Sequence, residues 1–259
     1  HNEYLSMKDE ATEEESKHVL KLGYQCLAGS LIWVSRFAHK EIAQGISVAC
    51  RVMSKPSYKA WDHLLQMVAW LRDHKHRGMR FTSDAMEHGL VATCDASNKA
   101  DLKDSRCQYS YVIQWLGGTI SNVSAKLTIA GYGSPANEYM AIRWAASKVR
   151  KFRNLIFELG YAEVIQKPTK VYCDNNTAIH WLKTGKITDG NQYLDLAYHQ
   201  PREWEREGTI LVLGIHTEGN VSDLGSKPCG SKEYGLFLDV LTGYSKWIIR
   251  HPRSTISFT

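Results

Sequence analysis

The sequence contains no run of about 18 uncharged apolar residues, and its first residues are followed by acidic ones instead of an apolar stretch. We therefore expect no membrane span, no secretory signal and no membrane partner, and we interpret the chain as soluble and intracellular. Its six cysteines include no Cys-x-x-Cys pair, which argues against a zinc ribbon and a disulfide scaffold. The N-terminal part also lacks a glycine-rich phosphate loop, so we expect catalysis elsewhere.

What is present is typical of a folded globular protein. Of the 259 residues, 43% are hydrophobic and 23% are charged, which excludes a disordered or collagen-like chain. The length fits one large domain or two modest ones. A formal net charge of +5 is compatible with a polyanionic partner but does not require one.

Shifts in composition divide the chain into four parts: a polar lead-in (1–20), a helical segment (21–84), an α/β domain (88–229) and a C-terminal tail (230–259). In the helical segment, Pro56 separates two apolar stripes at helical spacing. The stripes consist of Ile42, Ile46, Ala49, Cys50 and Met53, and of Trp61, Leu64, Leu65, Val68 and Leu71.

The α/β part predicts a mixed five-stranded sheet with flanking helices, in the order βββαβαβα. Strands are expected near 90–94, 109–115, 119–125, 171–173 and 209–215, with a glycine turn at Gly117-Gly118 between the second and the third. Helices are expected from Ser134 to Gly160, from Asn175, over 192–207 and over 221–226. Pro201 should kink or split the helix over 192–207.

Four carboxylates are predicted to meet at one edge of this sheet. Asp95 and Asp174 end the first and fourth strands, which should be neighbours, while Glu138 lies in the first turn of the long helix and Asp223 begins a late one. Taken singly, each is more simply explained as a helix cap or a solvated group. Together, carboxylates without histidine or thiolate neighbours suit Mg²⁺, or Mn²⁺, rather than zinc. Two such ions can support in-line phosphoryl displacement.

Longer strings around these residues resemble the RNase H domain of copia-type long-terminal-repeat retrotransposon reverse transcriptases. The matching strings are Cys94-Asp95-Ala96-Ser97 with Asp101, Gly117-Gly118-Thr119-Ile120-Ser121, Asn137-Glu138-Tyr139-Met140-Ala141, residues 171–179 (VYCDNNTAI) and residues 217–228 (TEGNVSDLGSKP). The helical opening is similar to the connection or thumb-like segment that precedes that domain, through Gly29-Ser30-Leu31, Trp33, Met53-Ser54-Lys55-Pro56, Trp61 and Trp70-Leu71. The resemblance covers about residues 22–229.

The resemblance implies that Asp95, Glu138, Asp174 and Asp223 are catalytic, metal-binding carboxylates, with Asp95 between the two ions. It implies a hydrolase that cuts the RNA strand of RNA·DNA hybrids, leaving a 5′-phosphate and a 3′-hydroxyl. The implied partners are the hybrid and an upstream reverse transcriptase palm in the same polyprotein. The implied location is a cytoplasmic virus-like particle or the nucleus. Ser97 and Asn175 are candidates to contact the 2′-hydroxyl, and His216 is a further candidate for substrate binding.

The chain departs from the family pattern in two places. Ser134-Pro135-Ala136-Asn137 replaces the usual Ser-Thr-Glu-Ala before Glu138, which removes a second acidic residue. Gln192-Tyr193-Leu194-Asp195 replaces the usual Lys-His-Ile-Asp, and Gln200-Pro201 replaces an apolar pair in the same helix. His199 and His216 are the remaining candidates for an assisting histidine, and either also fits a structural role. A basic stripe on the long helix could follow phosphates or be a solvated face. It consists of Arg143, Lys148, Arg150, Lys151 and Arg153. The same two interpretations apply to a second basic set. It consists of Arg72, Lys75, Arg77 and Arg80, with Trp61 and Trp70.

Two other functions remain open. A catalytically inactive or domesticated module could bind nucleic acid or support a polymerase without cutting it. Another enzyme of the same fold, such as an exonuclease or a transposase, is also conceivable. Exonucleases of this class place a glutamate two residues after the first aspartate, and here that position is Ser97.

Overall fold

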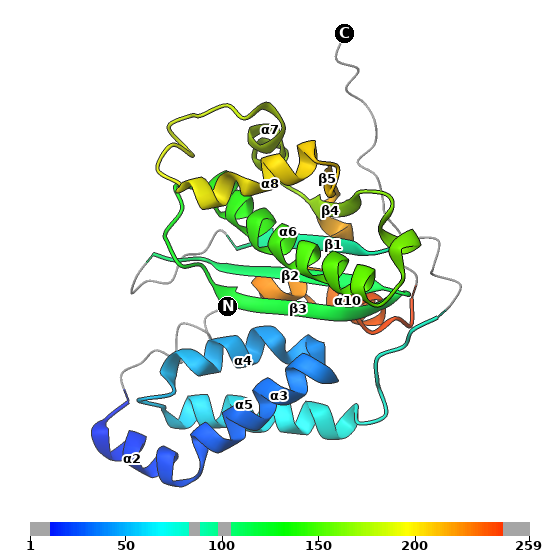
Figure 1. Ribbon diagram of the computed structural model, residues 1–259. Helices are drawn as coiled ribbons and strands as arrows, with labels where there is room; N and C mark the ends of the chain where they lie inside the picture. Colours follow the sequence, from blue (N-terminus) through cyan, green and yellow to red (C-terminus); the bar gives the residue numbers. More distant parts are fainter. Residues whose placement is uncertain (1–10, 83–88, 98–104, 246–259) are drawn as a thin grey trace. The chain divides into compact units, whose positions relative to one another are not determined.

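The computed structural model describes residues 11–82, 89–97 and 105–245. The chain divides into two compact units, residues 1–79 and 80–259. The described part of the first unit is helical, and the second contains the sheet (Figure 1). Asp101, part of one matching string, lies outside the described residues.

The helices of the first unit surround a core that includes Val19, Tyr24 and Leu64. They are α2 (Glu13–Lys21), α3 (Tyr24–Phe37), α4 (Ala43–Ala49) and α5 (Tyr58–Asp73), with 3-10 turns η1 (Lys40–Ile42) and η2 (Cys50–Val52). Helix α2 lies mostly within the range expected as a polar lead-in, so the structure differs there. Thr12 caps it by accepting a hydrogen bond from the Glu15 amide, and Val19 is fully buried.

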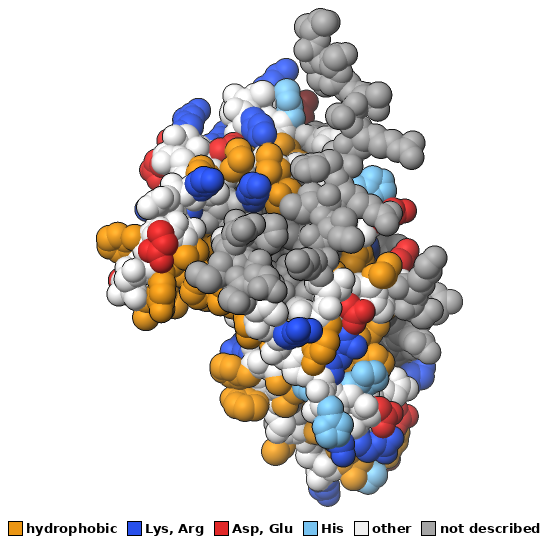
Figure 2. Space-filling view, turned by 90° about the vertical axis from the view of Figure 1, so that its right-hand side faces the viewer, with side chains coloured by type: hydrophobic (Ala, Val, Ile, Leu, Met, Phe, Trp, Pro, Cys, Tyr) orange, Lys and Arg blue, Asp and Glu red, His pale blue; other side chains and the backbone are white. Residues whose placement is uncertain are grey.

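The buried face of α5 differs from the expected stripe. Ala60, Leu64 and Met67 are buried, whereas Leu65 and Val68 are exposed. The buried positions are spaced by four and three residues, so they lie on one side of the helix, and that side is displaced from the expected stripe by about one residue toward the N-terminus. Acidic, basic and histidine side chains are intermingled on the face of this unit that Figure 2 shows.

The second unit contains the predicted mixed five-stranded sheet. Its strands are β1 (Val91–Ala96), β2 (Gln108–Trp115), β3 (Gly118–Lys126), β4 (Thr169–Cys173) and β5 (Ile210–Gly214). The order is β3-β2-β1-β4-β5. The first three strands are antiparallel, and β4 is parallel to both β1 and β5. The predicted fold class is confirmed, including the first and fourth strands as neighbours.

A tight turn joins β2 and β3, one residue earlier than expected. Leu116 (φ 53°) and Gly117 (φ 77°) both have positive φ, as in the two-residue turns that match the twist of a hairpin. Glycine is favoured at position 118 for a different reason, because a Cβ atom there would lie 2.5 Å from the Arg80 carbonyl oxygen.

Helices cover both faces of the sheet. One face packs against α6 (Ser134–Glu158), α7 (Asn176–Thr184) and α8 (Leu196–Arg206), and the other meets α9 (Asp223–Ser226) and α10 (Ser231–Thr242) (Figure 1). Alternation along β2 supplies both cores, because Tyr111 and Ile113 contact the first set while Val112 contacts the second. Short 3-10 turns η4 (Ala162–Ile165) and η5 (Thr217–Gly219) complete the described elements.

Two expectations need correction. The range 230–259, expected as a tail, contains α10, whose Phe237, Leu238 and Leu241 are buried. Their spacing gives the helix one apolar face that fits the sheet.

Helix α8 also continues through Pro201, where a kink or a split was expected, so the helix is not split there. Proline removes the amide that would bond to the carbonyl of Ala197. The Arg143 Nε donates a hydrogen bond to that carbonyl oxygen instead, at 3.2 Å. Among the described helices, none is long and apolar enough to cross a membrane.

Candidate metal centre

The predicted carboxylates lie on four elements of the second unit. Asp95 is in the central strand β1, and Asp174 directly follows β4. Because β1 and β4 are parallel neighbours, their carboxyl ends meet at one edge of the sheet. Asp223 is the first residue of α9. Glu138 lies one turn into α6, which begins at Ser134, so it is slightly farther from the helix terminus than expected.

The structure brings these carboxylates together. Oxygens of Asp95, Asp174 and Asp223 lie within 4.8 Å of one another. Glu138, the Cys173 sulfur and Asp174 form a second such group. Asp174 belongs to both groups, so the four acidic side chains are contiguous. Their role as metal ligands stays a prediction.

A neighbouring side chain contacts one oxygen of each carboxylate. Ser226 donates a short hydrogen bond to Asp95, Thr217 to Asp174 at 3.0 Å, the Cys173 thiol to Glu138 at 3.7 Å, and the Lys227 ammonium forms an ion pair with Asp223 at 2.9 Å. Sequence reasoning assigned none of these contacts. The sequence feature that could have indicated these contacts is the polar string 217–228, because it supplies three of the four contacting side chains.

Burial and mutual repulsion raise the pKa values of three of these acids. The pKa of Glu138 is well above its usual value because of burial and then because of the nearby Cys173 and Asp95. Burial and the charge of Asp95 raise the pKa of Asp174. The same causes, opposed by Lys227, raise the pKa of Asp223 to about 8. Asp95 thus perturbs all three of the others, which is expected of the central member of the cluster.

The residues fit a hard divalent cation. Asp223 Oδ1 is buried, and among the described residues it has no hydrogen-bond partner. A buried carboxylate oxygen without a partner is costly unless a cation compensates it. Oxygen ligands from several aspartates are the set that Mg²⁺ and Mn²⁺ prefer. Asp95, Asp174 and Asp223, with Glu138 beside them, are the residues that would hold it.

The three predicted substrate contacts have structural partners. The Ser97 hydroxyl accepts a hydrogen bond from the Gln108 amide at 3.2 Å. Asn175 directly follows Asp174 in the sequence. Its side-chain oxygen caps α7 by accepting a hydrogen bond from the Ala178 amide at 3.0 Å. His216 is about half exposed, two residues after the end of β5. Contact with a substrate stays a prediction for all three.

His199 contacts the Tyr139 hydroxyl at 2.9 Å. Burial and the nearby Arg202 lower the pKa of His199. These contacts favour the structural interpretation of this histidine.

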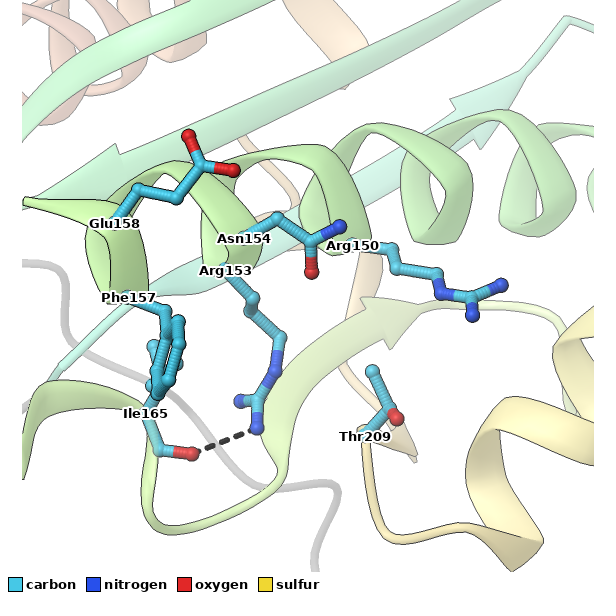
Figure 3. A pocket seen from close by; sticks show the side chains of 7 residues that line it. All are labelled: Arg150, Arg153, Asn154, Phe157, Glu158, Ile165 and Thr209. Atoms are coloured by element: carbon cyan, nitrogen blue, oxygen red, sulfur yellow. Dashed lines mark hydrogen bonds between the residues drawn. The ribbon is translucent and has the colours of Figure 1, made fainter. Parts of the chain in front are cut away.

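Part of the basic stripe on α6 forms hydrogen bonds within the protein. Arg153 donates to the carbonyl oxygens of Ile165 and Lys167, and it lines a pocket of about 400 Å³ with Arg150 and Phe157. Figure 3 shows the Arg153 guanidinium turned toward Ile165. Phe157 is 19 residues from Glu138, about 28 Å along the helix. This pocket is therefore separate from the carboxylates.

In the first unit, Trp70 of the second basic set stacks on His74.

Comparison with known proteins identifies transposon polyproteins as relatives. The chain is 25% identical over 235 residues to the retrovirus-related Pol polyprotein from transposon TNT 1-94 of Nicotiana tabacum, covering 90% of this chain and 17% of that protein. It is 24% identical over 212 residues to the corresponding polyprotein from transposon RE2 of Arabidopsis thaliana, covering 79% and 14%. The chain thus spans less than a fifth of the length of these relatives. The resemblance to retrotransposon Pol polyproteins is confirmed.

Solved structures similar to part of this chain include LC11-RNase H1 in complex with an RNA/DNA hybrid. The likeness has a TM-score of 0.38 and 14% identity, and it covers 51% of this chain and 88% of that one. No family model matches the chain.

Proposed function

We propose that this chain, which is similar to a part of retrotransposon Pol polyproteins, is a ribonuclease H-type endonuclease that cuts the RNA strand of RNA·DNA hybrids. The observation that carries the proposal is the convergence of Asp95, Asp174 and Asp223 within 4.8 Å beside Glu138. The matching strings around these residues support the substrate class. The similarity to transposon Pol polyproteins supports the setting.

Two divalent cations held by these carboxylates would lower the pKa of the attacking water and stabilise the departing 3′ oxygen. The protein's own contribution is to fix the acids before the substrate arrives. Asp95 sits on the central strand and interacts with each of the other three acids, so it is the residue that would help to hold both cations. Thr217 orients Asp174, and Ser226 orients Asp95.

The reaction is a hydrolysis. Water attacks the phosphorus, the bond to the 3′ oxygen breaks, and the products carry a 5′-phosphate and a 3′-hydroxyl. Selectivity for RNA requires a contact with the 2′-hydroxyl. Asn175 and Ser97 are the candidates nearest in sequence to the acids, and His216 is a further candidate for contact with the substrate.

The decisive test is cleavage of an end-labelled RNA·DNA hybrid in Mg²⁺ and in Mn²⁺, with an RNA·RNA duplex as the specificity control. Asp174→Asn should lower turnover by at least about 100-fold, because a neutral amide binds a divalent cation poorly. Its thermal stability should be maintained, since the substitution removes a charge that burial disfavours.

Asp189→Asn is the matched control, because Asp189 is exposed in the loop before α8. It should cleave at the wild-type rate. Wild-type protein that binds the hybrid but cleaves it in neither metal would instead favour the inactive binding module. Cleavage by Asp174→Asn at the wild-type rate would contradict the metal-centre assignment.

The similarity to Pol polyproteins also supports an upstream reverse transcriptase palm as a partner and an intracellular location, in a virus-like particle or the nucleus. Sequencing the DNA upstream of the codon for His1 tests the first proposal. A palm reading frame continuous with this chain is the expected result.

A further inference from the structure

Lys227 is the cation closest to the acidic cluster in the described structure. It follows α9, and its ammonium lies 2.9 Å from Asp223 Oδ2 and 3.9 Å from Asp95 Oδ2. Both aspartates are buried, whereas 41% of the Lys227 side chain is exposed. A positive charge on a flexible stem therefore enters the carboxylate site from the solvent side.

We propose that Lys227 is a built-in counter-ion that competes with divalent cations for Asp95 and Asp223, and so sets the metal concentration at which the centre fills. The inference rests on the proposed metal-dependent function and adds a regulation of the same site.

Charge balance gives the first reason. Asp95, Asp174 and Asp223 are within 4.8 Å of one another, and burial makes their repulsion stronger than it would be in water. Lys227 relieves that repulsion, and the two aspartates in turn raise the pKa of its ammonium despite partial burial. The cluster therefore has a positive charge available to it before any metal binds.

Shared ligands give the second reason. A cation coordinated by Asp95 and Asp223 would lie against the same two carboxylates that Lys227 contacts or approaches. An ammonium and a divalent cation repel each other at this range, so metal binding must displace or weaken the ion pair. Asp223 Oδ1, which has no hydrogen-bond partner among the described residues, is the oxygen left for the incoming ion.

Exposure gives the third reason. Lysine has four rotatable methylene groups and a strongly hydrated head, and the exposed part of the side chain provides a route to water. Ser226 and Thr217, which contact the same cluster, are held on short side chains and lack this freedom. Lys227 is thus the group that can leave without moving α9.

Lys227→Met tests the competition, because it keeps the stem and removes the charge. We expect Mn²⁺ and Mg²⁺ to bind roughly tenfold or more tightly, as measured by isothermal titration calorimetry in the absence of nucleic acid. The metal-free variant should also melt at a lower temperature at neutral pH, because the acids lose their counter-ion. Lys227→Arg should return both values toward the wild type.

Lys167→Met is the control variant. Lys167 is exposed and precedes β4 at the end opposite Asp174, so its removal changes the net charge equally but leaves the site intact. Its metal affinity should equal that of the wild type. Unchanged or weaker metal binding by Lys227→Met would overturn the inference.

A second measurement uses the wild-type protein and does not depend on folding of a variant. Reductive methylation of Lys227, followed by peptide mass spectrometry, should be slow in EDTA and several-fold faster in saturating Ca²⁺, with Lys167 as the internal reference. An equal rate in both conditions would show that metal binding does not release the ammonium.

The two proposals fail separately. If the wild type cleaves the hybrid but Lys227→Met binds metal no more tightly, the nuclease assignment stands and the counter-ion does not. If Lys227→Met binds metal more tightly but no protein cleaves the hybrid, the counter-ion inference stands and the nuclease assignment does not.

Discussion

Thr217 donates the hydrogen bond that opposes the rise in the pKa of Asp174. Replacing Thr217 with valine keeps the shape and removes the donor, so the pKa of Asp174 should rise further. We expect the acidic limb of the pH profile of hybrid cleavage to move to higher pH. Thr217→Ser retains the hydroxyl and should restore the limb. A downward shift in Thr217→Val would contradict the geometry.

The raised pKa of Asp223 predicts how stability depends on pH. Its usual value is 3.8, and in the folded protein it is about 8. Between these values the folded state retains a proton that the unfolded state has lost, so stability falls as pH rises through this window. Divalent cations bind the ionised folded form and should restore stability most at the upper end.

Melting temperatures in EDTA and in MgCl₂, measured from about pH 5 to about pH 8, check this expectation. Asp223→Asn provides the comparison, because its amide does not titrate. The variant should gain stability relative to the wild type as pH rises in EDTA, and this gain should shrink in MgCl₂. A gain that is independent of pH would mean that Asp223 is ionised throughout.

Among the elements, α8 shows how a neighbour compensates for a break in a helical pattern. The Arg143 side chain on α6 bonds to the Ala197 carbonyl that Pro201 leaves without its usual partner, and the guanidinium also lies 4.3 Å from the centre of the Trp144 ring. Arg143→Met should therefore destabilise the protein by about 1.5 to 3 kcal/mol, the typical contribution of a hydrogen bond from a charged group.

A double-mutant cycle with Pro201→Ala isolates this contact. Alanine restores the amide that bonds to Ala197, so the cost of Arg143→Met should be smaller in that background. Chemical denaturation of the four proteins measures the coupling. Strictly additive costs would show that Arg143 acts through its packing on Trp144 alone.

At the scale of the whole molecule, α10 completes the second face of the sheet. Phe237 and Leu241 pack with Val112 and Leu224 in one cluster, and the Thr119 hydroxyl donates to the Leu241 carbonyl at 2.7 Å. Because a buried large apolar side chain contributes about 1.5 to 3 kcal/mol, a chain ending at Pro228 should lose several kcal/mol of stability.

Urea denaturation of the chain ending at Pro228 and of one ending at Ser245 makes the comparison. The longer chain should match the full-length protein. Since Leu224 belongs to α9, the shorter chain should also bind Mn²⁺ more weakly. Equal stability of the two truncated chains would show that α10 is dispensable for the sheet.

The sequence by itself determined the strands, the main helices, the class of the sheet and the four acidic residues. These features are local: alternation, helical spacing, glycine at a turn, and aspartates at strand ends within the matching strings. Pairing of the first and fourth strands followed, because helical connections favour parallel neighbours.

Only the tertiary structure decided what contacts those acids and what completes the core. Ser226, Thr217 and Lys227 meet Asp95, Asp174 and Asp223 through chain folding, and no periodicity encodes which hydroxyl or ammonium faces which carboxylate. The same holds for the contact between Arg143 and the helix turn at Pro201, which are 58 residues apart. It also holds for α10, whose short apolar pattern forms a buried face only because it packs against residues such as Val112. Such contacts depend on side-chain direction and burial, which are properties of the assembled fold.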